Sequence, residues 1–408
     1  MKITTYAVSI ALIMGFGSFQ NGNCNNPGNR QTIVFMRHGE KPTQNLFCSL
    51  GQLTCQGLNR ALALPQVLHS RFGKPDFIFA PNPAKKILDG CLKSNSYVRP
   101  LATIEPTAIQ YNMPVNTPLG FSHFVSMGDL LLSEPYRNST IFVAWEHVNI
   151  YLMVTTMIGK LGGNPTIVPI WLNDDYDSLY VLTIDWDNDR GTVKFRREYQ
   201  GLNDKSRICP STETAKTVKQ ESASPIKTIF IVPSAETDGV GQLSCMGINR
   251  SLDLKNVLQS ANPEVGLNID YFFAAAPNLG LFAQNEESFY YQRSLMTLEP
   301  TAISQTKPLR VLFDYNDSAG MAAHIAKDSY RSSTLAIAWD PSQIQQLATL
   351  IYTQSGGNSA DIPPGEPDFN TIYKITIAEN ASPTFQTFSE GLAPLSVCPL
   401  PIRVLPKS

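Results

Sequence analysis

The residues best suited to chemistry follow one short apolar run. The run is Ile33–Met36, and the polar sequence RHGE follows it at Arg37–Glu40. The imidazole of His38 can serve as a nucleophile, and the adjacent guanidinium of Arg37 can bind an anionic group. Ile33–Met36 has the length and residue types of a buried parallel strand. An open α/β sheet places its ligand site at the carboxyl ends of such strands, so the sequence predicts a site here.

A second copy of this stretch keeps the strand and lacks the Arg-His pair. It lies at Thr228–Glu236 and reads TIFIVPSAE, against TIVFMRHGE at Thr32–Glu40. A repeat of this length indicates a duplicated domain, not a solenoid unit. Other segments recur at a similar spacing: Gly51–Arg60 as Gly241–Arg250, Arg99–Ile109 as Arg293–Ile303, Ala144-Trp145 as Ala338-Trp339, and Gly162–Asn164 as Gly356–Asn358.

Each copy alternates apolar strands with amphipathic helices. This alternation predicts an α/β fold with two tandem three-layer αβα domains, each a mostly parallel sheet covered by helices on both faces. Thr54 is a suitable N-cap for the first helix. Leu119–Pro135 and the segment around Cys48 are expected to be loops that set specificity. In the first copy the expected strands are Ile33–Met36, Phe77–Ala80, Thr140–Trp145, Tyr180–Asp185 and Val193–Glu198, and the expected helices are Leu53–Ser70, Pro100–Asn112 and Val148–Leu161.

The two copies and the sequences around them divide the chain into four parts. Residues 1–23 resemble a signal peptide, because a basic residue precedes the apolar stretch Tyr6–Gly17, which is too short to span a membrane. A buried N-terminal helix is the alternative. Domains are expected at 24–202 and 225–408, joined by a linker at 203–224 that is rich in Ser, Thr, Lys and Glu. A signal peptide predicts a secreted or periplasmic protein.

The composition is that of a folded protein without a strong net charge. The 408 residues are 43% hydrophobic and 16% charged, and the formal net charge is −2. This balance, with no run of Lys or Arg, gives no general attraction to nucleic acid or to an anionic membrane. Neither is an expected partner.

The cysteines follow the repeat. Two of them recur at equivalent positions of the second copy, and two more lie where the first copy has no match. The simplest hypothesis is a set of three bridges, because disulfides persist in exported proteins, and free buried thiols are the alternative. No spacing resembles a zinc site. The hypothetical bridges are Cys55–Cys209, Cys245–Cys398 and Cys48–Cys91.

The order of motifs in the first copy resembles that of the histidine phosphatase (phosphoglycerate mutase-like) superfamily. The resemblance rests on RHGEK at Arg37–Lys41, followed by the pattern LTxxGxxRA at Leu53–Ala61. An Arg with a Thr four residues later comes next, at Arg99 and Thr103, and His147 follows a later strand. The second copy resembles the same scaffold without the chemistry, so it reads as a degenerate copy.

The resemblance implies a metal-independent phosphatase, and the expected signal peptide would make it an exported one. His38 would attack phosphorus and carry the phosphoryl group as a phosphohistidine. Arg37, Arg99 and His147 would bind phosphate oxygens. These cationic groups supply the charge that the transition state needs, so no metal and no cofactor is expected. The expected partner is a small phosphorylated substrate, and the alternative is a binding or scaffold protein that holds phosphate without turnover.

The proton donor for the leaving group is the least defined part of the expected site. Glu146 is a candidate, but it precedes His147, and neighbouring residues of a strand face opposite sides. Glu105 recurs as Glu299 in the degenerate copy, which favours a structural role. Val148 occupies the position of the Asp in the His-Asp pair of the acid phosphatase branch. Either the acid lies elsewhere, or the substrate has a good leaving group, such as a phosphoamidate or a pyrophosphate.

Several of these residues also have structural explanations. Arg99 persists as Arg293, so packing at the start of a helix is an alternative to phosphate binding. Glu40 persists as Glu236, which favours a structural hydrogen-bonding role. Three lysines are candidates for extending the phosphate-binding rim, although exposed lysines are mostly just solvated. These are Lys41, Lys85 and Lys86.

The second copy lacks the groups needed for phosphoryl transfer. Pro233–Ala235 replaces the Arg-His-Gly sequence, and Pro341 replaces His147. Ser234 has no identifiable base that would make it a nucleophile. The second copy is therefore expected to be catalytically dead. It is expected to support the first copy, to bind another molecule, or to provide a domain–domain or homodimer contact.

Overall fold

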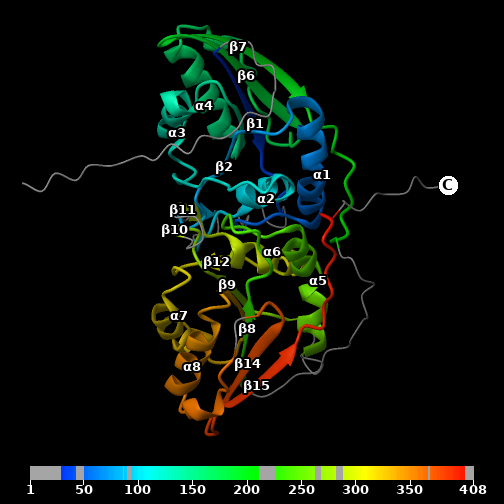
Figure 1. Ribbon diagram of the computed structural model, residues 1–408, viewed down its shortest axis with the longest axis vertical. Helices are drawn as coiled ribbons and strands as arrows, with labels where there is room; N and C mark the ends of the chain where they lie inside the picture. The colour runs from blue at the N-terminus through cyan, green and yellow to red at the C-terminus, as the bar shows by residue number, and fades with distance from the viewer. Residues whose placement is uncertain are drawn as a thin grey trace, which may run out of the picture.

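The computed structural model describes most of the chain as two similar halves, stacked along the long axis of the molecule (Figure 1). The expected signal peptide, the expected Cys48–Cys91 bridge, Lys86 and the linker beyond residue 210 lie outside the described residues, so these expectations and the domain boundaries stay predictions. The described residues are 29–42, 50–85, 87–89, 93–210, 226–261, 268–281, 288–365 and 368–399.

The first half contains a five-stranded sheet in the order β2-β5-β1-β6-β7. Three of the five strands, β2, β5 and β1, are parallel to one another, and β6 and β7 add an antiparallel edge. The apolar run of β1 is fully buried, as expected for a strand covered on both faces. The strands are β1 (Arg30–Arg37), β2 (Phe77–Phe79), β5 (Thr140–Trp145), β6 (Ser178–Asp187) and β7 (Arg190–Tyr199), and a separate hairpin joins β3 (Ile87–Asp89) to β4 (Lys93–Asn95).

Within the described part of this half, four α-helices cover the sheet. The predicted N-cap is confirmed, because the Thr54 hydroxyl accepts a hydrogen bond from the Gly57 N–H at 3.2 Å. The prediction of a loop over Leu119–Pro135 is wrong in part, since the segment contains a helix. Met127 and Leu131, four residues apart, give that helix a buried face. The elements are α1 (Cys55–Phe72), α2 (Arg99–Tyr111), α3 (Phe124–Leu132) and α4 (His147–Lys160), with the short 3-10 helices η1 (Glu134–Tyr136) and η2 (Pro165–Ile167).

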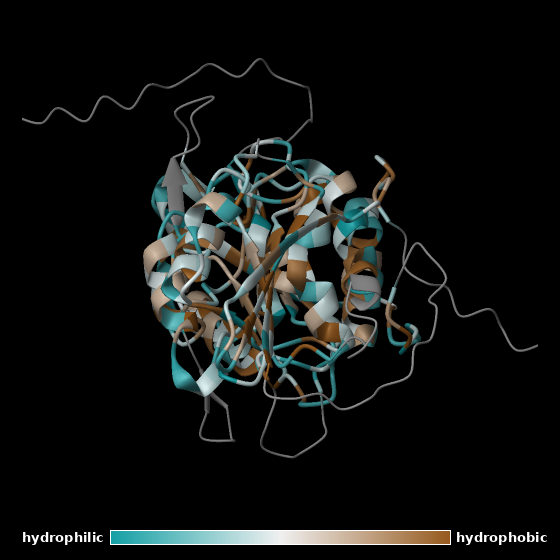
Figure 2. Ribbon diagram, turned by 90° about the horizontal axis from the view of Figure 1, so that it is seen from below, coloured by the Kyte–Doolittle hydropathy of each residue, from teal (hydrophilic) through white to brown (hydrophobic). Residues whose placement is uncertain are grey.

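The second half repeats this architecture. Its sheet order β12-β9-β13-β8-β14-β15 matches the first sheet with one added edge strand. Figure 2 shows the hydrophobic strands lying between helices on both sides. The predicted α/β class is confirmed. The strands are β8 (Ile226–Pro233), β9 (Tyr271–Ala274), β10 (Leu279–Leu281), β11 (Ser288–Tyr290), β12 (Leu309–Val311), β13 (Thr334–Trp339), β14 (Thr371–Ala378) and β15 (Thr384–Ser389); the helices are α5 (Cys245–Ala261), α6 (Arg293–Ser304), α7 (Ser318–Ile325), α8 (Ile344–Gln354), η3 (Asp328–Tyr330) and η4 (Ser359–Asp361).

The two halves share one hydrophobic cluster where α1 and α2 meet α5 and α6 in the middle of the molecule (Figure 1). Hydrogen bonds also cross the junction: the Gln292 side chain donates to the Val115 carbonyl at 2.8 Å, and the Val311 N–H donates to the Ser96 hydroxyl oxygen at 3.2 Å. A domain–domain contact through the second copy is therefore present.

Two of the three predicted disulfides are confirmed. Cys55 bonds to Cys209 and Cys245 bonds to Cys398, so each bridge ties the start of α1 or α5 to the chain beyond the last strand of its half. The described start of the expected linker also packs on α1, because Asn59 donates to the carbonyl of Ile208 at 2.7 Å. Across the described residues, no helix is both long enough and apolar enough to cross a membrane.

Candidate active site

The parallel pairing of β1 and β5 brings the two predicted histidines to one edge of the sheet. Arg37 is paired with Trp145 at the end of the ladder, and the His38 N–H donates to the Trp145 carbonyl at 3.1 Å. The ends of β1 and β5 therefore lie side by side. His38 comes directly after β1, and Glu146 and His147 come directly after β5. This is the carboxyl edge at which the sequence predicts the site.

His38 is held as a neutral imidazole with one free nitrogen. Its Nδ1 lies 2.7 Å from the Gly39 carbonyl, which can only accept, so Nδ1 carries the proton and Nε2 keeps its electron pair. The side chain is 1% exposed. Burial, together with the charges of Arg99 and Arg37, holds the pKa of His38 well below its ordinary value. At neutral pH the ring is in the form that a nucleophile requires.

The loop after β1 is held against α1 and α2 by close packing and by hydrogen bonds. The Gly39 N–H donates to the Thr103 hydroxyl at 2.9 Å, and this hydroxyl donates to the Arg99 carbonyl at 2.8 Å. A Cβ atom on Gly39 would lie only 2.9 Å from the Gly57 carbonyl oxygen, so only glycine allows this approach of the loop to α1. Thr103 thus couples the position of His38 to the start of α2.

Arg37 is anchored at one edge of its guanidinium group. Its Nη1 donates to the carbonyls of Asn173 and Asp175 at 2.7 and 3.0 Å, and its Cζ lies 3.9 Å from the centroid of the Tyr176 ring. Its Nε is buried and has no hydrogen-bond partner among the described residues. Burial lowers the pKa of Arg37, yet an arginine remains charged at any physiological pH. Because Nη1 holds the guanidinium group in place, the Nε–H can donate a hydrogen bond to a bound anion.

Arg99 is the first residue of α2 and lies close to both members of the Arg-His pair, since its charge lowers the pKa of His38 and of Arg37. Its Cζ lies 4.7 Å from the centroid of the buried Tyr97 ring. The Tyr97 and His38 rings are in turn nearly perpendicular, with an interplanar angle of 88° and centroids 6.2 Å apart. The predicted cluster of two guanidinium groups around one imidazole is therefore present.

Glu146 and His147 meet, so the expectation that they face opposite ways is wrong. The reason is that β5 ends at Trp145, Glu146 is the N-cap of α4, and His147 is the first helical residue. Glu146 Oε2 accepts from the Asn149 N–H at 2.9 Å, and its Oε1 lies 2.5 Å from His147 Nδ1. Burial raises the pKa of Glu146, but hydrogen bonds and charge from His147 and the helix N–H groups outweigh it and hold the pKa below its ordinary value.

Asn173 connects the two sides of the site. Its carbonyl accepts from Arg37 as described, and its side-chain oxygen lies 2.7 Å from His147 Nε2. Sequence reasoning missed this residue together with Asp175 and Tyr176. The segment that carries Asp175 does recur, because Asp368 accepts the same two backbone hydrogen bonds in the second half as Asp175 does in the first. Tyr97 carried a signal that sequence reasoning missed, since a Tyr two residues before the Arg recurs in the second half.

The remaining charged candidates separate into structural and peripheral groups. Glu40 forms a partly buried ion pair with Arg60 at 2.8 Å, and Glu236 forms the equivalent pair with Arg250 at 2.6 Å, so the predicted structural role of Glu40 is confirmed. The charge of Lys41 also lowers the pKa of His38, which places it near the site. Lys85 is exposed.

The corresponding position in the second half holds an internal carboxylate. Ser234 stands where His38 stands in the first half, and its hydroxyl lies 3.3 Å from the Tyr291 hydroxyl. Asp340, the counterpart of Glu146, accepts from the Tyr291 hydroxyl at 2.8 Å and from Arg293 at 3.2 Å. No imidazole lies within hydrogen-bonding distance of Ser234 among the described residues.

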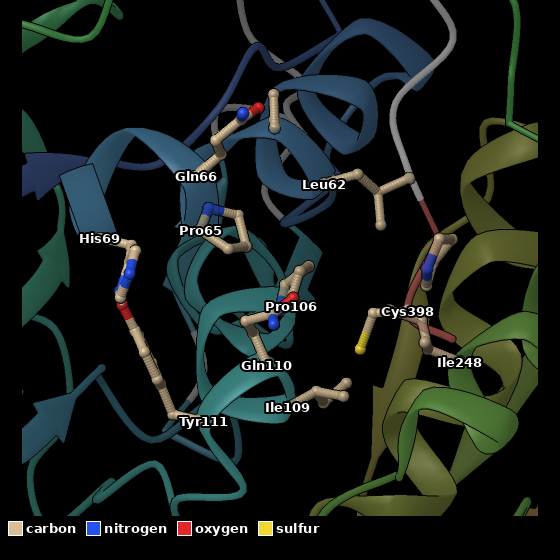
Figure 3. Close-up of a pocket in the computed structure, with 12 residues that line it drawn as sticks. Leu62, Pro65, Gln66, His69, Pro106, Ile109, Gln110, Tyr111, Ile248 and Cys398 are labelled. Atoms are coloured by element: carbon tan, nitrogen blue, oxygen red, sulfur yellow. The ribbon is translucent and has the colours of Figure 1, made fainter. Parts of the chain in front are cut away.

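A cleft of about 410 Å³ lies apart from this site, between α1, α2 and the end of the described chain (Figure 3). Figure 3 shows His69 and Tyr111 at one end, joined by a hydrogen bond of 2.9 Å, and Ile248 and Cys398 at the other. Its lining is mostly apolar and contains no Arg or Lys among the described residues, so it lacks the charge that a phosphate site needs.

The sequence matches no protein-family model and no curated protein. Solved structures similar to this chain include the protein histidine phosphatase SixA complexed with tungstate, which is 15% identical. The matched region covers 41% of this chain and 97% of the SixA chain, with a TM-score of 0.29. A phosphoserine phosphatase mutant from Entamoeba histolytica, in complex with phosphoserine, is 14% identical and covers 42% of this chain and 98% of that chain (TM-score 0.27).

A phosphoglycerate mutase from Plasmodium falciparum is 13% identical and covers 47% of this chain and 99% of that chain, with a TM-score of 0.27. Likeness at this level carries no information about activity, so the function has to follow from the geometry of the site.

Proposed function

We propose that the first half is a phosphatase that transfers a phosphoryl group to His38 and then to water. The observation that carries this proposal is the state of His38: a buried, neutral ring whose Nδ1–H is bound to the Gly39 carbonyl, beside Arg37 and Arg99. This leaves Nε2 as the nucleophile and places two fixed positive charges where phosphate oxygens would lie.

The reaction has two steps. Nε2 of His38 attacks phosphorus and forms a P–N bond, while the bond to the leaving group breaks and its electron pair departs with that group. Water then attacks the phosphohistidine, the P–N bond breaks, and phosphate and neutral His38 are released. Arg37 and Arg99 supply positive charge to the phosphoryl oxygens in both steps, and His147 at the same edge of the sheet is the third proposed phosphate ligand, so the chain itself provides the electrostatic stabilisation.

The role proposed for Glu146 is to orient His147. A carboxylate whose pKa is held below its ordinary value has no proton to give at neutral pH. Its contacts with His147 and with the N-terminus of α4 instead fix the imidazole at the edge of the site. This favours substrates whose leaving group needs little protonation, such as phosphoamidates and pyrophosphates, over simple alkyl phosphates.

The test is detection of the covalent intermediate. After incubation with acetyl phosphate or phosphoramidate and a rapid quench, we expect acid-labile, base-stable phosphate on His38. His38→Ala should abolish both the label and turnover, a loss of at least about 10³-fold. Ser234→Ala is the matched control at the equivalent position of the second half and should leave both unchanged.

Full turnover by His38→Ala would reject the enzymatic proposal. A wild-type protein that binds phosphate but forms no label would instead support the second candidate, a non-catalytic phosphate-binding protein. One observation favours that candidate: Glu146, the carboxyl group in contact with His147, has a pKa below its ordinary value and is therefore not a proton donor at neutral pH.

The proposed compartment is extracellular or periplasmic. The two disulfides of the described chain are of the kind that persists in oxidising environments. The second half is proposed to be catalytically dead and to support the first through the contact between α2 and α6.

A further inference from the structure

The two halves hold the same tyrosine–arginine pair in the same geometry. Tyr97 precedes Arg99 at the start of α2, and Tyr291 precedes Arg293 at the start of α6. The arginine Cζ lies 4.7 Å from the tyrosine ring centroid in the first half and 4.9 Å in the second. Both tyrosines are buried. The pair was therefore kept in both halves while the histidines were not.

The backbone that carries each pair is also the same. The Arg99 N–H donates to the Gly51 carbonyl at 3.0 Å, and the Arg293 N–H donates to the Gly241 carbonyl at 3.2 Å. Both glycines have a positive φ, of 69° and 84°, which favours glycine at these positions. The ring, the guanidinium group and the backbone therefore have the same arrangement in both halves. A group bound by the pair in one half indicates the kind of group that the pair in the other half can bind.

In the second half the pair binds an oxygen atom of an anion. The Tyr291 hydroxyl donates to Asp340 Oδ2 at 2.8 Å, and Arg293 Nη2 donates to the same oxygen at 3.2 Å. Asp340 follows β13 as Glu146 follows β5. The Asp340 carboxylate thus occupies the position in which the pair receives a negatively charged oxygen.

In the first half this position is not taken by a carboxylate. Glu146, the counterpart of Asp340, is turned toward His147 and the N-terminus of α4. The Tyr97 hydroxyl is buried and meets no hydrogen-bond acceptor among the described residues. Burial raises the pKa of Tyr97 to about 12, so the hydroxyl keeps its proton throughout the physiological range.

We infer that the Tyr97 hydroxyl binds substrate by donating a hydrogen bond to an oxygen of the phosphoryl group, beside Arg99. In the second half, Asp340 acts as an internal substitute for that phosphoryl group and closes the half to external oxyanions. The identity of the anion rests on the proposed function, whereas the existence of an oxyanion site at Tyr97 rests on the comparison of the two halves.

The test measures inorganic phosphate binding to the full, disulfide-bonded protein by isothermal titration calorimetry. Tyr97→Phe should weaken phosphate binding about ten- to hundredfold, the usual effect of losing one hydrogen bond to a charged group. Tyr291→Phe is the matched control, because it removes the same hydroxyl from an equally buried ring, and should leave phosphate affinity unchanged. Equal phosphate affinity of the wild type and Tyr97→Phe would overturn the inference.

Asp340→Ala provides an independent test. Removing the internal carboxylate should leave Tyr291 and Arg293 able to bind phosphate, so the variant should bind a second equivalent. A folded Asp340→Ala protein with a single site, as judged by its thermal unfolding transition and titration, would contradict the role given to Asp340. If this variant does not fold, the comparison of Tyr97→Phe with Tyr291→Phe decides.

The phosphohistidine assay separates this inference from the proposed function. An unlabelled wild type whose phosphate binding is weakened by Tyr97→Phe would reject the phosphatase and retain the oxyanion site. A labelled wild type whose phosphate binding is insensitive to Tyr97→Phe would retain the phosphatase and reject the role of Tyr97.

Discussion

At the scale of single residues, the chemistry depends on which form of His38 the fold stabilises. The hydrogen bond to the Gly39 carbonyl selects the tautomer, and burial between Arg37 and Arg99 disfavours the imidazolium. A surface histidine in the same sequence would be partly protonated near neutral pH and would have no preferred tautomer. The site therefore prepares the nucleophile before any substrate arrives.

The imidazole of His38 should titrate well below its ordinary pKa of 6.5. Because the folded-state pKa is depressed, the neutral form persists as the pH falls through 6.5 and is lost only near the lower, folded-state pKa. Imidazole nitrogen NMR over a pH titration measures this value directly. Arg99→Gln should raise the His38 pKa, because it removes a nearby positive charge, and Arg293→Gln in the second half should not change it. A His38 pKa of 6.5 or higher in the wild type would contradict this expectation.

At the scale of elements, α2 does two jobs for the site. Its first residue is Arg99, and one turn later Thr103 holds the loop that carries His38. The second half keeps this arrangement without the chemistry: the Ala235 N–H donates to the Thr297 hydroxyl at 2.9 Å, and that hydroxyl donates to the Arg293 carbonyl at 2.8 Å. The contact is therefore part of the scaffold, which the first half also uses to position its nucleophile.

Thr103→Val keeps the shape of the side chain and removes its hydroxyl, which leaves the buried Gly39 N–H without an acceptor. We expect the free energy of unfolding to fall by about 1–3 kcal/mol and turnover to fall about tenfold, as the His38 loop loses its support. Thr297→Val should cost similar stability and leave turnover unchanged. Denaturant titrations and initial rates on both variants measure the two effects, and a fully active Thr103→Val protein would show that the hydroxyl does not position His38.

At the scale of the whole molecule, the two halves are joined through a buried pair of carboxyl groups. Glu105 of α2 and Glu299 of α6 are both fully buried and form a hydrogen bond with each other. This requires that at least one of them carries a proton. Burial raises the pKa of Glu105 to about 8, and burial next to Glu105 raises that of Glu299. The sequence predicts a structural role for Glu105 and Glu299, and the structure shows that this role is a contact between the two halves.

This pair should make the protein less stable as the pH rises. The folded-state pKa lies above the unfolded value of about 4.5, so the stability from the protonated pair is fully present below that value and is lost as the pH rises through about 8. The slope is about 1.4 kcal/mol per pH unit for each extra proton held by the native state. Glu105→Gln should flatten the slope between pH 5 and 9 in denaturant titrations.

Glu390 serves as an internal reference for this measurement. Burial raises its pKa to about 7, so it lowers stability with rising pH in the same direction, but equally in the wild type and in Glu105→Gln. The difference between the two proteins therefore isolates the Glu105–Glu299 pair. An identical pH dependence in both proteins would show that this pair does not share a proton.

The sequence by itself determined the repeating strand–helix order, the N-cap at Thr54, two of the disulfides and the location of Arg37 and His38 at the end of a strand. These features depend on local periodicity, on capping chemistry and on the repeat, all of which can be read along the chain. Tertiary structure alone decided the contacts between distant segments: Asn173 with His147, Glu146 turned back to His147, and Glu105 against Glu299. Such contacts depend on how helices and loops pack, and that packing also decided the tautomer and charge of His38.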